Sequence, residues 1–317
     1  MNILEVKNLN MSYETLEGSV AAVKDVTFSL KEGESFGIVG ESGCGKTSVA
    51  MSLLQLQADN GKITSGEIIF DGKDIVKLNE KELRDVRWSG ISIVFQGAMN
   101  SWNPVVKIGE QIREAIREHY PDKTKEENTD KINELFNIVG LDNSIADRYP
   151  HELSGGMKQR AVIALALSCD PKLIIADEPT TALDVVIQDQ ILNEIRKVQD
   201  ILGLSLIYIS HDIAVIAEMT DNMAVMYAGR IVEKGPTKEV FENPRHSYTQ
   251  SLLASTPSVV GDKIKLKSLD GEPPSLINEQ IGCSFAPRCP NKNTSCNPNH
   301  NMELVAVSYT HLRAHET

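Results

Sequence analysis

The sequence predicts a mixed α/β fold built on a parallel sheet. Three short apolar segments, residues 35–39, 173–175 and 204–209, are typical of strands that are buried on both faces. The segment between the last two, residues 186–202, has helical spacing. Strands that alternate with helices along the chain indicate parallel pairing.

Further elements fit around this sheet. Residues 4–13 and 20–30 alternate between apolar and polar, as half-buried antiparallel strands do. Residues 47–57 read as a helix, and residues 68–70 and 91–95 as short strands. From Ile108 onward the apolar residues recur every three or four positions, which predicts a helical subdomain over about 97–168.

Composition excludes several classes of protein. The net charge of -12 argues against a nucleic-acid partner, because binding to a phosphate backbone usually needs a basic face. The longest apolar run, residues 161–167, is too short to cross a bilayer. The first ten residues lack the basic and then apolar pattern of a signal peptide. We therefore expect a cytosolic chain.

A phosphate-binding loop is the strongest local signal. Gly40-Glu-Ser-Gly-Cys-Gly-Lys-Thr47 has the glycine, lysine and hydroxyl spacing of such a loop, with an apolar strand before it and a helix after it. The glycines let backbone amides curl around phosphate oxygens, Lys46 neutralises the β- and γ-phosphates, and Thr47 offers a hydroxyl to Mg²⁺. The predicted ATP-binding residues of the loop are Gly40, Ser42, Gly43, Cys44, Gly45, Lys46, Thr47 and Ser48.

Two carboxylates end a later apolar strand. In residues 173–178 the strand runs into Asp177 and Glu178. Asp177 is predicted to hold Mg²⁺ through water, and Glu178 to polarise the attacking water. Acidic residues often end strands, so this pattern by itself is weak.

The segment just before that strand resembles the signature of the ABC ATPases. It reads Leu-Ser154-Gly155-Gly156-Met157, where the family usually has glutamine in place of Met157. The resemblance implies an ABC-type P-loop NTPase with a RecA-like core sheet, an antiparallel β subdomain and a helical subdomain. It also implies that Ser154, Gly155 and Gly156 close over the γ-phosphate held by a partner ATPase.

The remaining family motifs occur in order along the chain. By resemblance, Gln96 senses Mg²⁺ and faces the membrane subunits, Asp184 belongs to the loop that crosses to the partner ATPase, and His211 reaches the γ-phosphate. Singly, Gln96 could be a polar strand end, and residues 210–212 could cap the next helix. Tyr13 matches the aromatic residue that stacks on adenine, although a packed strand tyrosine is the alternative.

The resemblance narrows to the dipeptide/oligopeptide/nickel permease branch and its D-type ATPase. Residues 94–100, 225–231, 243–249 and 282–290 carry it. It implies import at the cytoplasmic face of the membrane, two transmembrane permeases, a second ATPase and an extracytoplasmic binding protein. Dipeptides, longer peptides, nickel and other solutes all stay open as cargo.

The rival class is a soluble ABC ATPase that acts on DNA or ribosomes. The DNA-organising kind inserts hundreds of residues between the glutamine and the signature, whereas Gln96 and Ser154 are 58 positions apart here (154 − 96). The ribosomal kind carries two cassettes in one chain, and this chain has one. Transport is therefore the favoured function.

The end of the chain divides into two parts. We expect an ATPase domain over 1–260, an extension over 261–306, and a tail over 307–317 that looks like a translated sequencing-library adapter, so that the natural C-terminus is missing. The extension contains Cys283, Cys289 and Cys296. By resemblance it holds a [4Fe–4S] cluster in the intact natural protein, and zinc or three reduced thiols are the alternatives.

Overall fold

The computed structural model describes residues 1–181, 183–255, 269–277, 282–292, 304–307 and 310–313. The chain divides into two compact units. The first contains residues 1–77 and 208–317, and the second contains residues 78–207. The strand β8 Ser205–Ser210 crosses the boundary between them.

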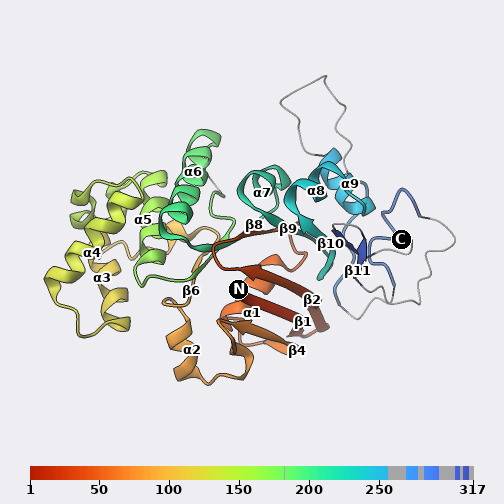
Figure 1. The fold of residues 1–317 in the computed structure, drawn as a ribbon, viewed down its shortest axis with the longest axis horizontal. Coiled ribbons are helices and arrows are strands. Elements are labelled where there is room, and N and C mark those ends of the chain that lie inside the picture. The colour runs from red at the N-terminus through yellow and green to blue at the C-terminus, as the bar shows by residue number, and fades with distance from the viewer. Residues whose placement is uncertain (182, 256–268, 278–281, 293–303, 308–309, 314–317) are drawn as a thin grey trace. The chain divides into compact units, whose positions relative to one another are not determined.

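The first unit contains an antiparallel sheet, a second set of strands, and helices (Figure 1). Its elements are β1 Asn2–Thr15, β2 Gly18–Lys31, β3 Ser35–Val39, α1 Lys46–Leu54, β4 Gly61–Phe70, β5 Lys73–Asp74, α7 Ile213–Met219, β9 Asn222–Tyr227, β10 Arg230–Pro236, α8 Thr237–Glu242, α9 Ser247–Ala254, β11 Val305–Val307 and β12 Thr310–Leu312. The strand β8 Ser205–Ser210 ends in this unit.

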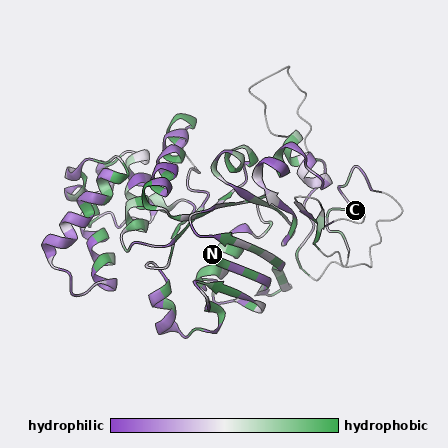
Figure 2. Ribbon diagram, in the orientation of Figure 1, coloured by the Kyte–Doolittle hydropathy of each residue, from purple (hydrophilic) through white to green (hydrophobic). Residues whose placement is uncertain are grey.

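The antiparallel sheet has the strand order β2-β1-β4-β5. Its alternating sequence places one face in the core, so that Leu4, Val6 and Phe28 are buried while Lys7 and Ser29 are exposed. Figure 2 shows the hydrophobic residues of these strands beside hydrophilic ones along each ribbon. The half-buried antiparallel strands expected from the sequence are confirmed, and both are longer than the periodic segments.

The second set of strands carries the phosphate-binding loop. In it β3 pairs with β9 in parallel, and β10 pairs with β9 in antiparallel fashion. All five residues of β3 are buried, as the apolar run predicts. Asp221 fixes the start of this pair, because its Oδ2 accepts hydrogen bonds from the Ser35 amide at 2.9 Å and the Ser35 hydroxyl at 2.6 Å.

The described part of the tail also joins these strands. The strand β12 pairs with β10, with Glu233 opposite Leu312. Arg313 forms an ion pair with Asp25 at 2.8 Å. Thus residues that the sequence analysis set aside from fold reasoning pair with the sheet in this structure.

The second unit is mostly helical. Its elements are α2 Glu80–Val86, β6 Ile91–Val94, α3 Ile108–His119, α4 Lys125–Ile138, α5 Gly155–Leu167, β7 Leu173–Asp177 and α6 Val185–Leu202. Short 3₁₀ turns connect some of them, at Ala98–Asn100, Asn143–Asp147 and Pro150–Glu152. The strands β6 and β7 pair in parallel.

Helical spacing in the sequence explains the packing of α3 and α4. On α3 the buried residues are Ile108, Gly109, Ile112 and Ile116, and the three isoleucines lie about one turn apart on one face. On α4 Thr124 caps the first turn, since its hydroxyl accepts a hydrogen bond from the Glu127 amide while the Glu127 carboxylate accepts one from Thr124 N. The helices predicted between 108 and 168 are confirmed, and in the described part of the chain no helix is long and apolar enough to cross a membrane.

A buried histidine next to α9 gives this fold a pH dependence. His246 is 5% exposed, and its Nδ1 accepts a hydrogen bond from the Tyr248 amide at 3.1 Å, which caps the helix. Burial lowers the pKa of His246 to about 4, so the ring is neutral in the folded protein at pH 7. Because the unfolded chain takes up this proton near pH 6.5, folding stability contributed by the neutral ring is lost as the pH falls from about 6.5 to about 4.

We therefore expect that moving from pH 7.5 to pH 5 costs the folded protein about 2 kcal/mol through this residue. The variant His246→Asn keeps a capping oxygen and does not titrate, so its unfolding free energy should fall less over the same range. Denaturant titrations of both proteins at the two pH values measure the difference. Equal losses in the two proteins would contradict the assignment to His246.

Candidate nucleotide site

The first unit shapes the phosphate-binding loop between β3 and α1. Gly45 precedes α1 with a φ of 105°, in the left-handed region that glycine tolerates. A Cβ atom on Gly45 would lie 2.1 Å from the Ala22 carbonyl oxygen, and one on Gly40 would lie 2.1 Å from the Met226 carbonyl oxygen. Packing therefore requires glycine at both positions, since each approaches a neighbouring backbone too closely for a side chain.

Lys46 lies across this loop. Its Nζ donates hydrogen bonds to the Gly40 carbonyl at 2.7 Å and to the Glu41 carbonyl at 3.0 Å, and the residue is 5% exposed. Ser42, Gly43 and Thr47 are exposed beside it. The loop thus presents an ammonium group, a helix N-terminus without a side-chain cap, and an accessible hydroxyl, which together suit the phosphates of a nucleotide and its Mg²⁺.

The Cys44 thiol and the Tyr13 hydroxyl both lie at the phosphate-binding loop. The Cys44 thiol is buried, and burial raises its pKa, so it is a poor nucleophile. The Tyr13 hydroxyl lies 3.3 Å from the Ser48 hydroxyl at the start of α1. The structure therefore places the Tyr13 hydroxyl at the start of α1, next to the phosphate-binding loop.

His211 belongs to the same unit and follows β8 directly. The cap of α7 is made by its neighbours, because Asp212 Oδ1 accepts from the Ala214 amide at 2.8 Å and Ser210 Oγ accepts from the Asp212 amide at 3.0 Å. His211 is exposed. Helix capping thus accounts for Ser210 and Asp212, and it does not account for the histidine.

The second unit brings Gln96 and Glu178 together. In the parallel pair β6–β7, Val94 lies opposite Ala176, so the residues two positions further on reach the same end of the strands. There Gln96 Nε2 donates a hydrogen bond to Glu178 Oε2 at 3.0 Å. The strand register explains why these residues, 82 positions apart, meet.

Glu178 is held in an unusual backbone conformation. Its φ is 46°, which is strained for a residue with a side chain and is often found at functional sites. Thr181 Oγ1 donates a second hydrogen bond to the same Oε2, at 3.0 Å. Sequence reasoning missed Thr181, and only its spacing of three residues from Glu178 could have indicated this contact. Asp177 ends β7 and is 1% exposed.

The signature forms the N-terminus of α5. Ser154 caps α5, with its hydroxyl accepting from the Met157 amide at 3.3 Å, and Ser154 and Gly155 are exposed. Met157 contributes this bond through its amide, so the loss of the usual glutamine side chain leaves the cap intact. Asp184 caps α6 in the same way, through the Ile187 amide at 3.0 Å. Ala182, in the same predicted loop, lies outside the described residues.

Known families account for this combination of motifs. The sequence profile of the family described as "ABC transporter" matches residues 23–181, and the one described as "Oligopeptide/dipeptide transporter, C-terminal region" matches residues 232–296. This chain belongs to the ABC transporter family. It is accordingly an ATPase, and the loop residues described above fit ATP and Mg²⁺.

Individual relatives agree with this membership. A dipeptide transport ATP-binding protein of Bacillus subtilis is 43% identical over 297 residues, which cover 93% of this chain and 88% of the relative. An oligopeptide transport ATP-binding protein of the same organism is 46% identical over 290 residues, covering 90% and 81% of the two chains.

Solved structures of ABC ATPases have the same fold. A dimeric ATP-binding cassette bound to ADP and Pi has a TM-score of 0.66 and 28% identity, covering 74% of this chain and 98% of that one. A subunit of an ABC transporter complex from Clostridium perfringens has a TM-score of 0.65 and 29% identity, covering 76% and 91% of the two chains. The ABC-type α/β fold that the sequence predicts is confirmed.

Proposed function

We propose that this ABC ATPase drives the import of dipeptides or oligopeptides from the cytoplasmic face of a membrane. The observation that carries the proposal is the joint match of an ABC domain and, after it, the C-terminal region of oligopeptide/dipeptide transporters. The two Bacillus subtilis relatives, named for dipeptide and oligopeptide transport, support it. A nickel importer of the same branch and a soluble ABC ATPase are the alternative functions.

In the proposed reaction, different side chains bind the phosphates, hold Mg²⁺ and accept the proton of the attacking water. Lys46 and the loop amides bind the phosphates, while Thr47, Gln96 and Asp177 offer the oxygen ligands that Mg²⁺ prefers. Glu178 accepts a proton from the attacking water as the water oxygen bonds to the γ-phosphorus and the bond to the β–γ bridging oxygen breaks, which releases ADP. His211 donates a hydrogen bond to the γ-phosphate. Mg²⁺ supplies charge neutralisation at the phosphates when it is bound.

Hydrogen bonds from Gln96 and Thr181 support the role of Glu178. Both donors reach Oε2, which orients the carboxylate. Gln96 would thereby link the general base to the surface that contacts the permeases.

Tyr13 would stack on the adenine, in keeping with its position beside α1.

A second ATPase subunit would complete the site. Ser154, Gly155 and Gly156 lie at the positive end of α5, with Ser154 and Gly155 exposed, and this end would be a suitable partner for the γ-phosphate of another subunit's ATP. Asp184, Val185 and Val186 are exposed at the start of α6 and would lie at the same contact. Closing of the ATPase pair around ATP would move two permease subunits, which receive peptide from an extracytoplasmic binding protein.

The test is ATP hydrolysis by the transporter assembled with its permeases and second ATPase in vesicles. We expect peptide-stimulated hydrolysis, and we expect Glu178→Gln to lower it about a hundredfold or more while Mg-ATP binding persists, because only the proton acceptor is lost. Glu134→Gln, an exposed position on α4, is the matched control. Hydrolysis by Glu178→Gln within about threefold of wild type would refute the role of the carboxylate. Stimulation by nickel and not by peptide would refute the cargo.

The finer proposal concerns residues 261–306 as a separate extension with an iron–sulfur site. Cys283 and Cys289 are partly exposed and not in disulfides, and Cys296 lies outside the described residues. Within the described ranges no group of three or more His, Cys, Asp or Glu side chains could hold a metal ion. The described residues alone do not form a metal site, so the proposal rests on the thiolate chemistry of three cysteines in a short, Pro- and Asn-rich segment.

For the intact natural protein prepared without oxygen, we expect bound iron and broad visible absorption from a thiolate-bound cluster. Cys289→Ser should remove the iron while Mg-ATP binding persists, and Cys169→Ser, at a cysteine far along the chain from the extension, is the control. Iron analysis of the purified proteins measures the outcome. Iron-free natural protein would contradict the cluster, and bound zinc would support the lesser alternative.

A further inference from the structure

A buried arginine of the C-terminal segment reaches the phosphate-binding loop. Arg288 lies 247 positions from Glu41, yet its Nη1 is 2.7 Å from Glu41 Oε2 and its Nη2 is 3.0 Å from Glu41 Oε1. The pairing is bidentate, which is the strongest geometry for a guanidinium and a carboxylate. The Arg288 side chain is 5% exposed and that of Glu41 is 27% exposed, so water screens this pair little.

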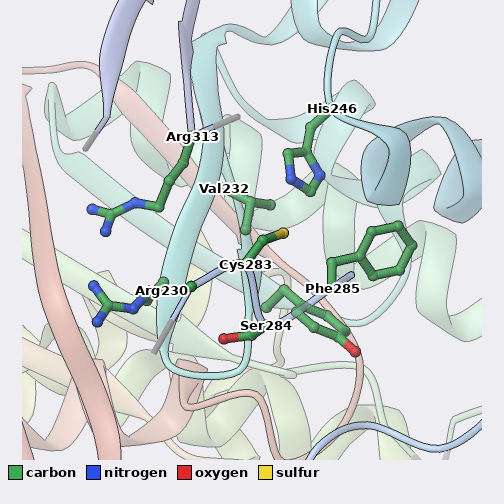
Figure 3. Close-up of a pocket in the computed structure, with 9 residues that line it drawn as sticks. Arg230, Val232, His246, Cys283, Ser284, Phe285 and Arg313 are labelled. Carbon is green, nitrogen blue, oxygen red and sulfur yellow. The ribbon is translucent and has the colours of Figure 1, made fainter. Parts of the chain in front are cut away.

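The surroundings of Arg288 fix it in place. Its Nε donates to the Asp270 carbonyl at 3.1 Å, and its Nη1 also donates to the Tyr227 hydroxyl at 3.3 Å. Three residues earlier, Phe285 is 2% exposed and packs against Tyr227 and Tyr248, with ring centroids 5.3 and 5.4 Å away. Figure 3 shows Phe285 beside His246, in the same pocket as Cys283. This segment is therefore anchored in the core of the first unit.

Glu41 hydrogen-bonds to several residues in and around the loop. Its amide donates to the Tyr248 hydroxyl at 3.0 Å, and its carbonyl accepts from the Cys44 amide at 3.2 Å and from Lys46 Nζ at 3.0 Å. With Arg288 on the carboxylate, the amide, the carbonyl and the side chain of Glu41 are all engaged. The position of Glu41 therefore influences the position of the lysine that binds phosphate.

The charges of Glu41 and Arg288 bear directly on nucleotide binding. Glu41 places a carboxylate in a loop that must hold the phosphates of ATP, and like charges at short range repel. The fixed positive charge of Arg288 offsets this carboxylate. Without it, the loop would carry an uncompensated negative charge next to Lys46.

We propose that Arg288 is a positioning residue for ATP binding, acting through Glu41. It neutralises the Glu41 carboxylate and holds the loop in the conformation that receives the phosphates. The C-terminal segment thus takes part in setting the affinity of the catalytic domain for nucleotide. The proposal rests on the assignment of this loop as the ATP site, and it is independent of the transported cargo and of any metal at the cysteines.

The test is a comparison of Mg-ATP affinity in four proteins, measured by calorimetric titration: wild type, Arg288→Met, Glu41→Gln and the double variant. We expect Arg288→Met to raise the Kd for Mg-ATP about tenfold, near the low end of known couplings between sites. Glu41→Gln should stay within about threefold of wild type, because the carboxylate and its repulsion are both removed. The double variant should recover to within about threefold of wild type for the same reason.

The recovery separates charge compensation from a merely structural role. Loss of packing by Arg288→Met would persist in the double variant, and it would lower the thermal midpoint without any rescue of affinity by Glu41→Gln. In the assembled transporter the change should appear in KM, with kcat within about twofold of wild type. Arg288→Lys keeps the positive charge that offsets Glu41 and loses the bidentate pair. It should therefore raise the Kd for Mg-ATP by less than about tenfold, and it gives a second arm if Arg288→Met does not fold.

Arg87→Met is the matched control, because Arg87 forms an ion pair with Glu80 at 2.6 Å within the second unit. It should bind Mg-ATP as wild type does. Equal affinity of wild type and Arg288→Met would overturn the proposal, as would a double variant as weak as Arg288→Met or a tenfold loss in Arg288→Lys. Failure of the wild type itself to bind Mg-ATP would instead overturn the assignment of the ATP site.

Discussion

The nucleotide site depends on how the backbone holds the Lys46 ammonium group. Two loop carbonyls, from Gly40 and Glu41, accept its hydrogen bonds, so a buried cation is held in place before a phosphate arrives. That arrangement needs β3 to end in a loop that passes close to neighbouring backbone, which only glycine permits at positions 40 and 45. The buried β3–β9 pair anchors the loop's start, and α1 continues from its end. The geometry of the loop is therefore a consequence of how these strands pack.

In the second unit, strand register and two hydrogen bonds fix the position of Glu178. Parallel register brings Gln96 and Glu178 to the same end of β6 and β7, and Thr181 gives the carboxylate a second donor. The strained φ of Glu178 is sustained by these neighbours. At Ser154 and Asp184, by contrast, the helix starts are exposed, which is the expected character of groups that serve a partner subunit. In the proposed mechanism, one chain thus carries a base for its own nucleotide and a helix terminus for another subunit's nucleotide.

Much of this could be predicted from sequence because local patterns carry it. The apolar run 35–39 coincides with β3, and the glycine, lysine and threonine spacing specifies the phosphate loop. Long-range partners were out of reach, since no periodicity links Arg288 to Glu41 across 247 positions. The bond of Thr181 to Glu178 was missed because it depends on a backbone conformation that sequence does not display. The strand β4 was predicted too short, because residues 61–67 lack an apolar alternation, and the pairing of β4 with β1 extends along them.

The central claim is that Lys46 and its loop bind the phosphates of ATP, and the most direct measurement is Mg-ATP binding by Lys46→Met. The substitution keeps most of the buried aliphatic stem and removes the charge, so folding should survive while the contact with phosphate is lost. Calorimetric titration should give a Kd at least about a hundredfold weaker than wild type, as expected for loss of a charged partner at a buried site. Binding within about threefold of wild type, by a variant with an unchanged unfolding transition, would contradict the account.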